Sequence, residues 1–189
     1  EFAELDPRSA RGSFYGLVVE ALELGAFIPL LLWLLSEQHA VATHQADKAL
    51  VAVESWAIRR TLLRRTMKDV NKLVVAILRE LDRYPSDRVG DATVDYLRNQ
   101  TADSRVWPSD EQLIAELPSI KAYGNIKQPR LRAVLCGVEM KMRTERNEDV
   151  SLPAKLEIEH VMPQGWRSYW SADIAGDHEA MSRRDLLVN

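Results

Sequence analysis

Apolar residues at helical spacing are the strongest indication of how this chain folds. One stripe recurs at intervals of three and four residues, at Val70, Leu73, Val74, Ile77, Leu78 and Leu81. This spacing places the apolar side chains on one face of an α-helix and leaves polar and basic residues on the others. A second stripe runs from Leu50 to Leu62 and carries Arg59 and Arg60 in its last turn, where cations suit the negative end of the helix dipole. The pattern predicts a mainly α-helical chain.

Helix-start signals mark further boundaries along the chain. Thr66 and Asp69 have the spacing of a capping box ahead of the first stripe. Ser109 and Gln112 repeat that spacing ahead of a short helix that Pro118 should end, and Pro129 suits the first turn of another helix. One side of that last helix carries Leu131, Val134, Leu135, Val138 and Met142. We expect six to eight helices up to about residue 146.

The pattern changes after about residue 147. Leu156, Ile158 and His160 alternate with Glu157, Glu159 and Val161, and this period of two predicts a strand that ends before Pro163 and Gly165. The predicted organisation is therefore a helical domain over residues 1–148, followed by a second module over residues 149–189.

Composition excludes several classes of protein. A single cysteine, Cys136, rules out a disulfide framework and favours the cytoplasm, and its apolar surroundings predict a packing role. The apolar stretch from Leu24 to Leu35 is too short to span a bilayer and contains Pro29, so we expect a buried helix pair or a kinked core helix and no membrane partner.

Charge is unevenly distributed although the formal net charge is only −3. Nine basic residues lie between Arg59 and Arg88 against four acidic ones. Among the nine, Arg64, Arg65, Lys68 and Lys72 lie at helical spacing and are the candidates for contacts with the DNA backbone. Charge alone favours the simpler alternative, a solvated helix face.

The pair Glu159-His160 has the residue types needed for metal-assisted hydrolysis of a phosphodiester. A histidine near its ordinary pKa can take a proton from water at neutral pH, and a carboxylate suits a hard divalent cation. As a bare dipeptide, the pair is more often an ordinary strand end than a catalytic site. Trp166, Tyr169 and Trp170 follow it and could stack on bases, although packing is the commoner role of such clusters.

Longer strings of the chain resemble a known family. IEHVMPQ, followed by Trp166 and Trp170, resembles the first signature of the HNH-like nuclease domain at the C-terminus of GmrSD-type restriction endonucleases and of related, SspE-like phage-defence proteins. ESWAIRRTLLRRTMKDVNKL, RVWPSDEQL and RLRAVLCGVEMKMR resemble further segments of this family in the expected order. The arginine pair in the first of these strings, Arg59 and Arg60, could hold phosphates or anchor acidic groups inside the helical domain, and we favour the structural role.

The resemblance implies a role for each matching residue. It makes His160 the general base of a ββα-metal fold and Glu159 a ligand of a divalent metal, Mg²⁺ or Mn²⁺, while Pro163 and Gln164 shape the turn beneath the site. The family continues with a GNLTL string and a helix that completes the metal site, whereas this chain ends in RRDLLVN. We therefore expect the chain to hold only the first part of the HNH-like module, and to bind no metal and have no activity by itself.

The resemblance also implies partners. The intact protein would cut or nick DNA, either modified or unmodified, and would carry a nucleotide-hydrolysing N-terminal domain whose DGQQR-like motif does not occur in this chain. The predicted function is that of the C-terminal portion of a metal-dependent restriction or phage-defence endonuclease. The alternative is a non-catalytic helical module that binds DNA or couples the absent domain to its effector, and the net acidity also permits a structural domain without affinity for nucleic acid.

Overall fold

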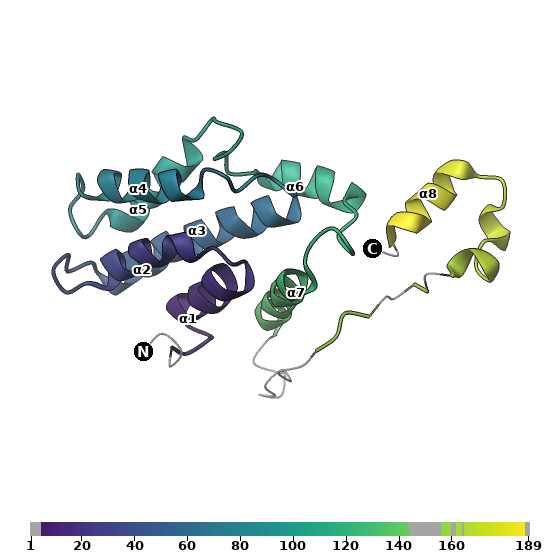
Figure 1. Ribbon diagram of the computed structural model, residues 1–189, viewed down its shortest axis with the longest axis horizontal. Coiled ribbons are helices and arrows are strands. Elements are labelled where there is room, and N and C mark those ends of the chain that lie inside the picture. Colours follow the sequence, from purple (N-terminus) through teal and green to yellow (C-terminus); the bar gives the residue numbers. More distant parts are fainter. Residues whose placement is uncertain (1–4, 144–155, 160–161, 164, 188–189) are drawn as a thin grey trace. The chain divides into compact units, whose positions relative to one another are not determined.

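The computed structural model describes residues 5–143, 156–159, 162–163 and 165–187, and these are mainly α-helical, as predicted (Figure 1). Their α-helices are α1 (Ala10–Phe14), α2 (Ile28–Leu35), α3 (Thr43–Leu62), α4 (Val70–Leu81), α5 (Val89–Arg98), α6 (Asp110–Glu116), α7 (Gln128–Met142) and α8 (His178–Leu187). A π-helical stretch, Tyr15–Ala21, continues α1, and short 3₁₀ turns cover Gly25–Phe27, Leu117–Ser119, Trp166–Ser168 and Ala172–Ile174.

The chain divides into two compact units, Glu1–Leu113 and Ile114–Asn189. The predicted domain boundary at residue 148 falls among residues 144–155, outside the described residues, and it stays a prediction.

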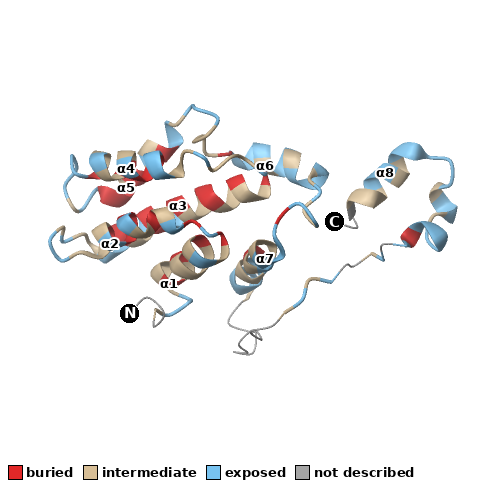
Figure 2. Cartoon of the chain, viewed as in Figure 1, coloured by how far each residue is buried: buried red, intermediate tan, exposed pale blue. Residues whose placement is uncertain are grey.

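Helix α3 is the central element of the first unit. It lies between α1 and the α4–α5 pair, and its inward face is buried along most of its length (Figures 1 and 2). Trp56 of α3 packs edge-on against Phe27 at 6.0 Å between ring centroids, and Phe27 packs in the same way against Phe14 at 6.2 Å. All three aromatic side chains have no exposed surface, so they form the centre of the core.

The apolar stretch that ends in α2 is part of this core. Pro29 lies in the first turn of α2, where a missing amide proton and a fixed φ are tolerated, so it begins the helix and does not kink it. Leu30, Leu31 and Leu34 are buried. Among the described residues, no helix combines the length and the apolar character needed to cross a membrane.

The two predicted capping boxes have different outcomes. The Ser109–Gln112 box forms at the start of α6, because the Ser109 amide donates to Gln112 Oε1 at 3.0 Å and the Gln112 amide donates to Ser109 Oγ at 3.2 Å. The Thr66–Asp69 box was wrong. The side chain of Asp69 makes no capping hydrogen bond to α4, and its carboxylate accepts a hydrogen bond from Ser104 instead.

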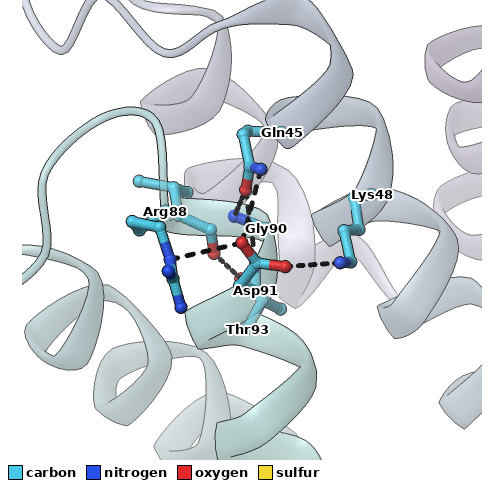
Figure 3. A network of polar contacts seen from close by, with 7 residues as sticks. Gln45, Lys48, Arg88, Gly90, Asp91 and Thr93 are labelled. Carbon is cyan, nitrogen blue, oxygen red and sulfur yellow. Dashed lines mark hydrogen bonds and ion pairs between the residues drawn. The ribbon is translucent and has the colours of Figure 1, made fainter.

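A polar contact that the sequence analysis missed joins α3 to α5 (Figure 3). Gln45 of α3 is 7% exposed, and its Oε1 accepts hydrogen bonds from the amides of Gly90 at 2.7 Å and Asp91 at 3.2 Å. The Asp91 carboxylate in turn pairs with Lys48 and, at 3.3 Å, with Arg88. The Gln45 side chain thus accepts hydrogen bonds from two amides at the start of α5, where the first amides of a helix have no acceptor within their own helix.

The second unit contains α7 and α8. Pro129 lies in the first turn of α7, as predicted. The predicted apolar side of this helix is only partly covered within the structure, because Val134 is buried whereas Leu135, Val138 and Met142 are 48%, 50% and 72% exposed.

The predicted strand at residues 156–161 does not form in its described part, Leu156–Glu159. A strand needs a hydrogen-bonded neighbour, and within the described residues the backbone forms only one isolated bridge, between Tyr123 and Ile126. The alternation itself is retained, since Leu156 and Ile158 are partly buried while Glu157 and Glu159 are exposed.

Candidate functional site

The residues predicted to carry catalysis fall at the edge of what the structure describes. His160 and Gln164 lie outside the described residues. Glu159 and Pro163 are described, and both are exposed. The described part of the candidate site is thus centred on Glu159.

The segment Leu156–Glu159 shares a cavity with α7. Arg132 of α7 donates from Nη1 to the carbonyl of Leu156 at 3.2 Å. The cavity has a volume of about 240 Å³ and is lined by Arg132, Leu135, Cys136, Glu139, Leu156, Glu157, Ile158 and Glu159. Cys136 is partly buried, so the thiol predicted to pack in a core lies beside the carboxylate-bearing segment.

The carboxylates around this cavity do not by themselves make a metal site. Glu139, Glu157 and Glu159 offer oxygen ligands of the kind that Mg²⁺ and Mn²⁺ accept. However, Glu139 pairs with Arg143 at 3.1 Å, and no group of three or more His, Cys, Asp or Glu side chains suited to a metal ion occurs in the described part of the chain.

Trp166, close to the candidate segment in the sequence, is a packing residue. It is 1% exposed, and its Nε1 donates to Asp185 of α8 at 3.2 Å. The guanidinium carbons of Arg167 and Arg184 each lie 5.7 Å from the centre of its ring. Trp166 is thus fixed between two cations and one carboxylate, which confirms the packing interpretation for this member of the aromatic cluster.

A charged pair holds the turn before α8 to that helix. Arg184 donates to both carboxylate oxygens of Asp173, at 3.0 and 2.7 Å. The hydrogen bonds from Arg184 hold the pKa of Asp173 below its ordinary value, and the same contact raises the pKa of Arg184. Tyr169 and Trp170, by contrast, are 86% and 50% exposed.

The four basic residues proposed to contact DNA do not share a helix, so the argument from helical spacing was wrong. Helix α3 ends at Leu62, and Arg64 has φ 54°, a left-handed conformation that ends the helix. Arg64, Arg65 and Lys68 therefore lie in the loop of residues 63–69, and only Lys72 lies on α4, 3.8 Å from Asp69. Their assignment to DNA stays a prediction that now concerns a loop.

The arginine pair has the structural role that was favoured. Arg60 has no exposed surface, and its guanidinium donates to the carbonyls of Val106, Thr66 and Asp103 at 2.7, 2.6 and 2.9 Å. Arg59 donates to the carbonyl of Pro108 at 3.1 Å and pairs with Asp110. The partners are mainly backbone carbonyls, whereas the expected partners were buried carboxylates.

A known protein family matches the C-terminal part of the chain. Residues 107–189 match the family described as GmrSD restriction endonucleases, C-terminal domain. No curated protein and no solved structure matches the chain. The matched region begins just before α6 and contains α7, the segment Leu156–Glu159, Trp166 and α8. Residues 107–189 of this chain are therefore similar to the C-terminal domain of the GmrSD restriction endonucleases.

Proposed function

We propose that this chain is the C-terminal portion of a metal-dependent, HNH-like endonuclease or nickase that acts on DNA in the cytoplasm, within a restriction or phage-defence system. The family match over residues 107–189 is the single observation that carries this proposal. The match includes the string IEHVMPQ, in which a carboxylate and a histidine adjoin.

In this proposal, each residue of the string has one task. His160 takes a proton from the attacking water, so that the water oxygen can form a bond to phosphorus while the bond to the leaving oxygen breaks. Glu159 is a ligand of a divalent cation, Mg²⁺ or Mn²⁺, which when bound stabilises negative charge on the phosphate. Pro163 and Gln164 shape the turn beneath the site. The exposure of Glu159 supports its part, because a metal ligand must be reachable by ion and substrate.

The experiment compares two histidines of the second unit in the longest natural protein that contains this chain. His160→Ala should slow the nicking of plasmid DNA by a factor of about 10² to 10⁴, the usual contribution of a general base. His178→Ala is the matched control, since His178 is an exposed first residue of α8, and it should nick at the wild-type rate. Wild-type nicking by the His160→Ala protein would refute the assignment of the base.

The carboxylates offer a second matched pair. Glu157 and Glu159 are both exposed members of the same extended segment and both line the same cavity. Glu159→Gln should raise the Mg²⁺ or Mn²⁺ concentration needed for half-maximal nicking, whereas Glu157→Gln should leave it unchanged. Equal behaviour of the two variants would count against Glu159 as the ligand.

We propose as a second candidate a helical module that binds DNA without cutting it, or that couples a nucleotide-hydrolysing domain to the nuclease. The supporting observation is that Glu1–Leu113 is a compact unit with its own core and lies mostly outside the family match. The loop of residues 63–69 is its candidate DNA contact, through Arg64, Arg65 and Lys68, with Lys72 beyond it.

A gel-shift titration against salt tests this second candidate. Arg64→Gln with Lys68→Gln should lower the magnitude of the slope of log K against log salt by about 2, since each lost phosphate contact removes roughly one released counterion. Arg79→Gln with Arg98→Gln is the control, because these two exposed arginines lie on helices outside the loop. Identical slopes for the two double variants would exclude the loop as the DNA contact.

A further inference from the structure

The segment of residues 103–108, here called the strap, is held to α3 through its backbone carbonyls. Trp56 Nε1 donates to the carbonyl of Arg105 at 2.8 Å, Arg60 Nη1 donates to that of Val106 at 2.7 Å, and Arg59 Nη1 donates to that of Pro108 at 3.1 Å. The three donors are spaced i, i+3 and i+4, so one face of α3 binds the strap.

Arg60 also binds the loop of residues 63–69. A single nitrogen, Nη2, donates to the carbonyl of Thr66 in the loop at 2.6 Å and to the carbonyl of Asp103 in the strap at 2.9 Å. The side chain has no exposed surface, and the guanidinium lies 5.2 Å from the centre of the Trp56 ring. Because the planar guanidinium directs its donors in fixed directions, a displacement of the loop carbonyl and a displacement of the strap carbonyl are tied to each other.

A second contact joins the same two segments. Asp69, at the end of the loop, accepts a hydrogen bond from the hydroxyl of Ser104 in the strap and lies 4.0 Å from Arg105. The carboxylate also lies 3.8 Å from Lys72. Asp69 therefore links the strap to Lys72, one of the four basic residues that we propose to contact DNA.

The strap leads directly into α6. Arg59 pairs with Asp110, the first residue of α6, and Ser109 and Gln112 close the capping box there. Helix α6 continues to Glu116, across the division between the two units at Leu113, and the family match begins within the strap at Trp107. Arg59 thus contacts both the strap and the first residue of α6.

We infer that the strap is a coupling element, in which Arg60 transmits a change in the loop of residues 63–69 to the start of α6. The inference deepens the proposed function, since it rests on the loop as the place where DNA binds. Phosphates at the loop compete with Asp69 for Lys72 and reposition the Thr66 carbonyl. Arg60 then carries that change to Asp103 and Val106.

Hydrogen–deuterium exchange tests the inference on the whole chain, with and without a duplex DNA at low salt. Arg60→Met removes the shared donor, and exchange should become faster by about tenfold or more both in loop peptides and in strap peptides, as expected when buried hydrogen bonds are lost. Arg79→Met, on the exposed face of α4, is the matched control and should change neither. Ser104→Ala removes only the second contact and should speed exchange in both segments to a smaller degree.

Duplex DNA supplies the other half of the test. In the wild type, DNA should slow exchange in the loop and in the strap, whereas in Arg60→Met it should slow exchange in the loop alone. Faster exchange of one segment without the other in Arg60→Met, or wild-type DNA protection confined to the loop, overturns the coupling. If DNA changes neither segment, the proposed DNA contact fails, and the comparison without DNA still decides the coupling. If Arg60→Met does not fold, the same comparisons are made with Ser104→Ala, and faster exchange of one segment without the other overturns the coupling.

Discussion

Replacing Gly90 by alanine tests the close approach of α3 and α5. A Cβ at this position would lie 2.5 Å from the carbonyl oxygen of Gln45, 2.8 Å from its Oε1 and 2.9 Å from Cβ of Lys48. Two of these three atoms cannot turn away, because one belongs to the backbone of α3 and the other is fixed to it. The two helices must therefore separate by several tenths of an ångström, and the buried hydrogen bond of 2.7 Å from the Gly90 amide to Gln45 weakens.

The magnitude follows from three contributions. Overpacking of a closely packed contact costs about 1–3 kcal/mol. Loss of the hydrogen bond costs about 1 kcal/mol more. The better helix propensity of alanine returns about 1 kcal/mol, since Gly90 lies within α5. We expect Gly90→Ala to lower the free energy of unfolding by about 2 kcal/mol, the sum of these contributions.

Urea unfolding followed by far-UV circular dichroism measures this difference. A loss of about 2 kcal/mol moves the midpoint down by roughly 1 M urea. The control is Gly16→Ala in the same unit, where a Cβ would meet nothing within 4 Å, and its stability should be unchanged or slightly higher. If Gly90→Ala unfolds at the same urea concentration as the wild type, the helices do not approach as closely at Gly90 as described.

Two further predictions concern single side chains. Trp166→Phe removes the donor to Asp185 and weakens the stacking of the two arginines, so it should destabilise the second unit by about 1–2 kcal/mol in the same assay, while Trp170→Phe, at a half-exposed position, should have no effect. Lys48, through its hydrogen bond, holds the pKa of Asp91 below its ordinary value of 3.8. A depressed pKa in the folded state contributes stability above the unfolded-state pKa that is lost as the pH falls through the folded-state pKa. The urea midpoint should therefore decrease as the pH is lowered below about 4, and it should decrease less steeply in Asp91→Asn. An equal dependence of the midpoint on pH in the two proteins would exclude this carboxylate as a source of the acid sensitivity.

The elements that could be predicted from the sequence depend on short-range patterns. The stripe from Val70 to Leu81 has the same bounds as α4, because apolar residues at helical spacing can be buried only as a helix. The Ser109–Gln112 capping box is likewise local, since both partners lie within one turn.

The Thr66–Asp69 capping box was wrong because a distant residue competed for a local partner. Asp69 has the right spacing to help cap α4, but Ser104, 35 positions away, binds its carboxylate. The basic residues after Leu62 continue a helical spacing in the sequence. The helix nevertheless ends there, because Arg64 has a left-handed conformation and the chain continues as a loop. Neither event has a signal within a few residues of the position it affects.

The amino-acid sequence was sufficient to establish that this chain is mainly helical, where several of its helices begin, and which nuclease family its C-terminal part resembles. These properties follow from residue spacing and from short strings, both of which are encoded along the chain. Tertiary structure decided what Arg60, Gln45 and Gly90 do. The three carbonyl acceptors of the Arg60 guanidinium lie outside α3, in two segments that only folding brings together. The Gly90 position requires glycine because the backbone of α3 lies against it, and helix–helix packing sets that distance.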